Sequence, residues 1–125
     1  MKRLKDRYNV ESIRFTREGP YDVLDRGLLE VVDSILPGGS IFHVFEAIPD
    51  DSGDVMMVVI DGETVIKFEI PRINFKEPRL VSGPPCDVEI EALDDYRRRM
   101  GQGKHRMFLD HVVADARRLL AENSR

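Results

Sequence analysis

Apolar residues near the N-terminus first alternate with polar ones and then recur at helical spacing. In residues 10–17, Ile13 and Phe15 alternate with polar side chains, which is the period-two pattern of a half-buried strand. In residues 21–36, apolar side chains recur every three or four positions, as in an amphipathic helix, before the helix-ending residues Pro37 and Gly38. The sequence therefore predicts a strand followed by a helix.

Three runs rich in β-branched and aromatic residues come next, and such residues fit the pleated surface of a sheet. They are Ile41–Ile48, Val55–Ile60 and Glu63–Ile70. The Asp61-Gly62 pair between the last two runs suits a type I′ turn, whose two central residues need positive φ. Residues 41–70 are therefore predicted to form an antiparallel β-meander with a tight hairpin at this pair.

A two-residue turn would also fix the register of the hairpin, with Val59 opposite Thr64. The buried face then consists mainly of Val55, Met57, Val59, Ile66 and Phe68. The register of the first run stays open, because a slip of one residue exchanges the two faces of a strand. The alternative buried sets are Phe42, Val44 and Ile48 with Glu46, or Ile41, Phe45 and Ala47 with His43.

The C-terminal part of the chain is predicted to be helical. Residues 86–92 alternate apolar and acidic side chains as a strand does, so a strand there stays an alternative. Acidic residues followed by Arg97 to Arg99 suit the dipole of a helix, and they favour a helix over 88–100. An apolar stripe predicts a second helix over 104–122. The expected architecture is one α+β domain over residues 1–125, with the meander packed against these helices and the helix 21–36.

Charge is distributed unevenly along the 125 residues, although the formal net charge is only −4. Residues 1–39 are neutral overall, whereas residues 40–95 carry −9 and residues 96–125 carry +5. An acidic middle and a basic C-terminal end attract each other, either within the fold or across a subunit interface.

Other features of the composition limit the classes of site and location. Cys86 is the only cysteine, which excludes an internal disulfide framework and a cysteine-rich zinc site. The basic N-terminal residues precede no apolar stretch of a secretory signal, and the apolar run 55–60 is too short to span a bilayer. A cytoplasmic protein without a membrane partner, a metal or another cofactor is expected.

Two groups of residues are candidates for specific chemistry. His111 and Asp115 lie four residues apart on one face of the last predicted helix, and with His43 or Glu46 they could serve a small enzyme as an acid-base pair. The same residues also suit an ordinary solvated helix flank. A basic cluster suits phosphate binding and makes nucleic acid an alternative partner. Its members are Arg97, Arg98, Arg99, Lys104 and Arg106. A solvated helix end, or an intersubunit ion-pair partner for the acidic middle, is favoured over phosphate binding as their explanation.

Some apolar residues fall outside the predicted helix stripes and indicate surplus apolar surface. They are Leu29, Leu36 and Met107. Such surface favours association with another protein or with a second copy of the chain. Because no group of residues specifies a reaction, the sequence favours a non-enzymatic protein-binding or self-associating module, a homodimer of the adaptor, immunity or chaperone type.

Overall fold

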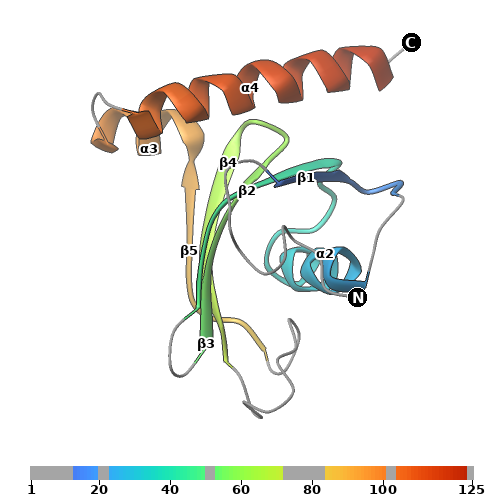
Figure 1. Cartoon of the computed structure of the whole chain (residues 1–125), viewed down its shortest axis with the longest axis vertical. Helices are drawn as coiled ribbons and strands as arrows, with labels where there is room; N and C mark the ends of the chain where they lie inside the picture. Colours follow the sequence, from blue (N-terminus) through green and yellow to red (C-terminus); the bar gives the residue numbers. More distant parts are fainter. Residues whose placement is uncertain (1–12, 20–22, 50–52, 72–83, 101–103, 124–125) are drawn as a thin grey trace.

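The computed structural model describes residues 13–19, 23–49, 53–71, 84–100 and 104–123, and it confirms an α+β fold built on a β-meander (Figure 1). The elements in chain order are β1 (Ile13–Thr16), α2 (Val23–Ile35), β2 (Ile41–Pro49), β3 (Gly53–Ile60), β4 (Thr64–Pro71), β5 (Cys86–Ala92), α3 (Leu93–Met100) and α4 (Lys104–Asn123). The strands form one antiparallel sheet in the order β1-β2-β3-β4-β5. β1 and β5 are therefore its two edges.

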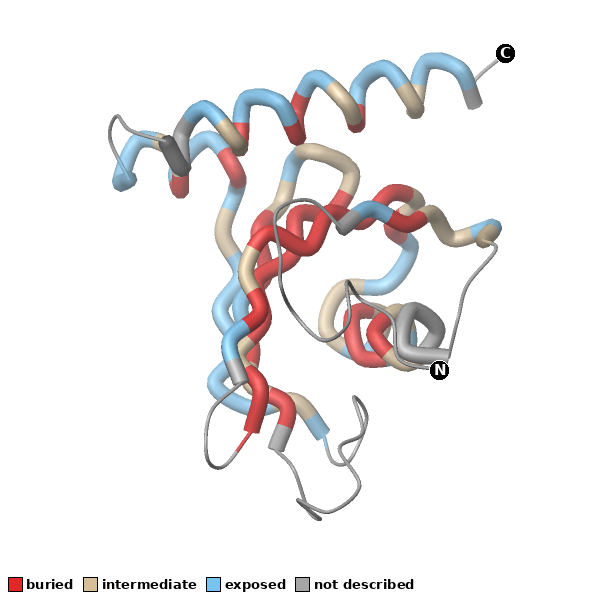
Figure 2. The backbone as a smooth tube through the Cα atoms, viewed as in Figure 1, coloured by how far each residue is buried: buried red, intermediate tan, exposed pale blue. Residues whose placement is uncertain are grey.

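Each face of the sheet carries its own apolar cluster. On one face, α2 packs through Leu28, Val31 and Val32 against side chains of the first four strands. On the other face, α3 and α4 pack through residues such as Tyr96 and Leu109 against β2, β3 and β4. Figure 1 shows α4 running across one end of the sheet, and Figure 2 shows buried backbone along the central strands. Both faces of the central strands are covered, which explains their nearly continuous apolar sequences.

The hairpin turn is confirmed, but its predicted register is wrong. Asp61 and Gly62 have φ values of 55° and 66°, and the N–H of Glu63 donates to the carbonyl of Ile60 at 3.0 Å, as in a type I′ turn. Thr64 nevertheless pairs with Ile60 instead of Val59, because Glu63 is an extra residue between the turn and the ladder. This shift moves Ile66 and Phe68 onto the α2 face, so the predicted buried set combines residues from two faces.

Neither predicted register describes the whole of β2. The strand pairs Val44 with Val58 and then Glu46 with Met57, so the register shifts between these two pairs. Such a bulge changes which side chains face each way along the strand. Phe42, Val44 and Ala47 consequently share the α2 cluster, whereas Phe45 belongs to the cluster of α3 and α4.

The helix predicted over 88–100 is wrong in its first part, because residues 86–92 form β5 and α3 begins only at Leu93. The open edge of β4 gives this segment a hydrogen-bonding partner, so its period-two alternation outweighs the helix-dipole pattern. β5 pairs Ile90 with Ile66 and Glu89 with Lys67. Asp94 and Asp95 occupy the first turn of the shorter helix.

The remaining predicted helices agree with the structure. α2 and α4 match the predicted ranges 21–36 and 104–122 closely, and β1 lies within the predicted strand 10–17. In α4, Leu109, Val112, Val113 and Ala116 are buried as the stripe predicted. None of the helices in the described ranges has the length and apolar character needed to cross a membrane.

Candidate functional site

A buried histidine joins the sheet to α4. His43 lies on β2 between Arg14 of β1 and Val59 of β3, and its side chain is only 2% exposed. Its Nε2 atom is 2.8 Å from Oδ2 of Asp115 on α4. This contact connects positions 72 residues apart in the chain.

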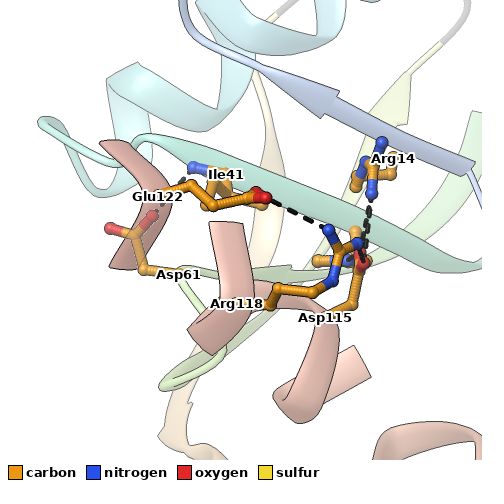
Figure 3. Close-up of polar contacts among 7 residues, drawn as sticks. Arg14, Ile41, Asp61, Asp115, Arg118 and Glu122 are labelled. Atoms are coloured by element: carbon orange, nitrogen blue, oxygen red, sulfur yellow. Dashed lines mark hydrogen bonds and ion pairs between the residues drawn. The ribbon is translucent and has the colours of Figure 1, made fainter. Parts of the chain in front are cut away.

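Asp115 is also the centre of an ion-pair network, which we call the Asp115 cluster: Arg14, His43, Asp115 and Arg118. Arg14 places Nη1 3.1 Å from both carboxylate oxygens of Asp115, and Arg118 donates to Oδ1 at 2.7 Å (Figure 3). Arg118 also lies 3.6 Å from a carboxylate oxygen of Glu122. One carboxylate therefore receives hydrogen bonds from β1, β2 and its own helix.

The surroundings favour an ionised Asp115 beside a neutral His43. Burial alone would raise the pKa of Asp115, but hydrogen bonds from His43, Arg14 and Arg118 outweigh it and bring that pKa to about 2. Burial lowers the pKa of His43, against the opposing effect of Asp115 and with help from the charges of Arg14 and His111. The neutral ring then donates its Nε2–H to Asp115.

The second ring nitrogen of His43 explains why charging this histidine is unfavourable. Nδ1 is buried and has no hydrogen-bond partner within the described part of the chain. In a protonated ring it would carry a buried N–H without an acceptor, which typically costs about 1–3 kcal/mol. An unprotonated Nδ1 needs no acceptor, so the neutral tautomer fits this site.

Of the four acid-base candidates, the structure brings Asp115 and His43 together. Asp115 lies against His43, and in the described hydrogen bonds it has no link to His111, which is exposed on α4. Glu46 lies further along β2, where its charge acts on Tyr96, whose pKa is raised first by burial and then by this carboxylate. A general base must reach a proton of its substrate. The burial of His43 instead favours a structural role, in which the Asp115 cluster anchors α4 to the sheet.

The arginines of the predicted basic cluster already have acidic partners. Arg97 pairs with Asp94 and Asp110, and Arg98 pairs with Asp95. Arg99 donates to Glu91 of β5 at 2.7 Å, so a basic residue near the C-terminus contacts the acidic middle within the fold. The side chains of Lys104 and Arg106 lie outside the described residues. A phosphate would have to compete with these carboxylates for the arginines.

The predicted surplus apolar residues occupy different environments. Leu29 and Leu36 are half-buried and pack against the α2 cluster, so they belong largely to the core. Met107 is 73% exposed on α4. Of the three, Met107 alone presents a mostly open apolar side chain.

The sequence prediction missed the most exposed strand, β5, because it assigned most of this segment to a helix. Val88 is 42% exposed and Ile90 is 53% exposed, although Ile90 lies opposite the fully buried Ile66. The apolar and acidic alternation of residues 86–92 was the signal that could have identified it. Apolar side chains on an edge strand are an unusual feature that calls for an explanation.

Acidic side chains line the other face of β5. Glu89 and Glu91 lie opposite Lys67 and Val65 of β4, on the face that carries α3. A small open hollow lies there. It is lined by Met57, Val65, Lys67, Glu89, Glu91, Tyr96 and Arg99. Asp87 has a φ of 53° beside a register shift in the ladder, which is the geometry of a β-bulge.

The described residues contain no group of three or more His, Cys, Asp or Glu side chains arranged to hold a metal ion. Comparisons with protein families, curated proteins and solved structures found no match for this chain. Its function is therefore inferred from the geometry of its own residues.

Proposed function

We propose that this protein is a non-enzymatic protein-binding module that receives an extended segment of another protein along the outer edge of β5. One observation carries the proposal: β5 is an edge strand that exposes two large apolar side chains, Val88 and Ile90. Extended segments bind such edges by adding a strand, with main-chain hydrogen bonds for affinity and alternate side chains for specificity.

The exposed side chains continue the apolar core to the edge of the sheet. Ile66 and Phe68 of β4 are buried on the α2 face, and Ile90 lies beside Ile66 on that face. A strand added next to β5 would cover Ile90 and Val88. Full burial of such a side chain contributes about 1.5–3 kcal/mol, and these two are already half covered, so about 1 kcal/mol each is available to a partner.

The charge of β5 favours a different protein over a second copy of this chain. Two β5 strands paired antiparallel about a twofold axis would place their acidic faces side by side, with Glu89 near its own symmetry copy. Like charges directly opposite one another destabilise a sheet. A homodimer formed through this edge is therefore disfavoured. The experiment described next distinguishes self-association from binding of another protein.

The test is affinity capture from a lysate of the native host with three forms of the protein. These are the wild type, Ile90→Gln and Met107→Gln, which remove one exposed apolar side chain each from β5 and from α4 without changing the charge. We expect Ile90→Gln to lose the captured protein and Met107→Gln to keep it. Hydrogen exchange of the purified complex should then show slowed amides in Cys86–Ala92.

Three results would contradict the proposal. One is a lysate that yields no protein specific to the wild type, and another is a partner retained equally by Ile90→Gln. The third is a complex in which exchange at β5 is unchanged. Protection of β5 that increases with protein concentration in the absence of any partner would instead identify a second copy as the occupant.

A further inference from the structure

We infer that the segment received by β5 alternates apolar and basic residues, so that charge selects the partner in addition to strand pairing. This inference rests on the proposed function and specifies its ligand. The observation behind it is the division of β5 into an apolar row, Val88 and Ile90, and an acidic row, Glu89 and Glu91, on opposite faces of the sheet.

A strand added to β5 would present its own side chains to both rows. Directly opposite side chains of neighbouring antiparallel strands lie on the same face, with Cβ atoms about 4.5–5.5 Å apart. Residues of the added strand beside Val88 and Ile90 would join the apolar row. Those beside Glu89 and Glu91 would sit at the acidic row, where lysine or arginine is favoured and an acidic residue is repelled.

In the described part of the chain, the counter-charges leave this edge acidic. Glu91 already accepts a hydrogen bond from Arg99 at 2.7 Å, and the Arg99 guanidinium lies 5.2 Å from the centre of the Tyr96 ring. Glu89 is exposed in the middle of β5, with Lys67 opposite it on the inner strand. Among the described residues, the three carboxylates of β5, Asp87, Glu89 and Glu91, outnumber these two cations. Glu89 is therefore the residue at which charge selection should be strongest.

The hollow on this face offers apolar surface to the stem of a long side chain. Its lining combines the carboxylates of Glu89 and Glu91 and the cations of Lys67 and Arg99 with the side chains of Met57, Val65 and Tyr96. A lysine or arginine stem packs on apolar surface while its charged head stays near carboxylates and water. The hollow thus favours a long stem, whereas the preference for a positively charged head depends on the exposed Glu89.

The probes are two labelled seven-residue peptides, one alternating valine with lysine and the other alternating valine with glutamate. Binding is measured by fluorescence anisotropy at physiological salt, and hydrogen exchange at Cys86–Ala92 reports strand addition. We expect the wild type to bind the lysine peptide about ten-fold more tightly than the glutamate peptide, since several charge pairs change sign together. A lysine peptide with a central proline should not bind, because proline removes a ladder donor.

The matched variants are Glu89→Lys on β5 and Glu30→Lys on the exposed side of α2, which change the net charge equally. Glu89→Lys should reduce the preference for the lysine peptide about five-fold, whereas Glu30→Lys should leave it unchanged. Equal effects of the two variants would mean that the preference comes from long-range charge and not from the acidic row of β5. That result would overturn the inference. Equal protection of β5 by both peptides would overturn it as well, while leaving the proposed function intact. If neither peptide protects β5, the inference and the edge-binding function fail together.

Discussion

Asp61 and Ile41 are joined by two reciprocal hydrogen bonds. The N–H of Asp61 donates to the carbonyl of Ile41 at 2.8 Å, and Oδ1 of Asp61 accepts the N–H of Ile41 at 2.8 Å (Figure 3). The same carboxylate oxygen accepts the N–H of Ser40 at 2.9 Å. The turn between β3 and β4 is thereby fixed to the first residue of β2, at the end of the sheet that α4 crosses.

Substitutions at Asp61 should distinguish the stabilisation by its carboxylate from the stabilisation that depends on its backbone conformation. Asp61→Ala removes the acceptor of two N–H groups and places alanine at a φ of 55°, so we expect a loss of about 2–3 kcal/mol in the free energy of unfolding. Asp61→Gly removes only the acceptor, and Asp61→Asn retains both an oxygen and tolerance of positive φ. Urea denaturation should rank the losses Ala, then Gly, then Asn. A variant Asp61→Asn as unstable as Asp61→Ala would contradict this explanation.

Stability should fall as the pH decreases below 6.5, because of His43. Its pKa in the folded protein is lower than the ordinary value of 6.5, so between the two values the unfolded chain binds a proton that the folded protein does not. The stabilisation is complete above pH 6.5 and is lost toward the lower pKa, with a slope of at most about 1.4 kcal/mol per pH unit. Urea denaturation from pH 7.5 to 5 should show this slope in the wild type and in His111→Leu, and a reduced slope in His43→Leu. An equal reduction of the slope in His111→Leu would mean that the pH dependence comes from general charge and not from the burial of His43.

Asp115 should be the more important of two carboxylates on α4. Asp115→Ala leaves His43 and Arg14 without their shared acceptor, and we expect a loss of about 2–4 kcal/mol at pH 7. Asp110→Ala, which removes a largely exposed partner of Arg97, should change stability by about 1 kcal/mol or less. The contribution of Asp115 is present above pH 3.8 and is lost as the pH falls toward its pKa of about 2. Denaturant midpoints of both variants at pH 7 test the ranking, and similar losses would contradict an anchoring role.

The sequence predicted local features well because local residues determine them. Asp61 and Gly62 specify a turn with positive φ, and the spacing of Leu109, Val112 and Ala116 specifies the buried face of α4. The register of the β strands depends instead on extra residues such as Glu63, which alternation alone does not reveal. When both faces of a strand are covered, a slip of one residue exposes no apolar row. The apolar pattern therefore does not distinguish the correct register from the shifted one.

The candidate site was predicted less well because its partners are distant in sequence. Spacing on α4 suggested Asp115 with His111 and left His43 and Glu46 as alternative further members, and the structure brings His43 to Asp115 from another element. Only the pairing of β1, β2 and β3 places that histidine under the helix. The conformation of β5 also depends on a distant partner. Its charge pattern suits a helix dipole, but the open edge of β4 pairs with it and makes it a strand.

Gly62 should be required both for its backbone conformation and for its contact with α4. Its φ is 66°, and a Cβ atom added there would lie 2.8 Å from Cβ of Ala116. Gly38 provides a matched control, because its φ is 93° but an added Cβ would meet nothing within 4 Å in the described structure. Both Gly→Ala substitutions carry the strain of a positive φ, on the order of 1 kcal/mol. Only the one at Gly62 also pushes α4 away from the turn.

The close approach of Gly62 to Ala116 should be measurable as a coupling between substitutions at these two residues. We expect Gly62→Ala to lose about 1–2 kcal/mol more than Gly38→Ala in urea denaturation, because overpacking adds to backbone strain. Ala116→Gly alone costs about 1 kcal/mol in helix propensity, yet in the Gly62→Ala protein it removes the clashing methyl group and should cost less. A double-mutant cycle measures this coupling as a favourable interaction of about 0.5–1 kcal/mol. Additive losses would mean that α4 does not rest against the hairpin in solution, because the coupling exists only while Ala116 lies over Gly62.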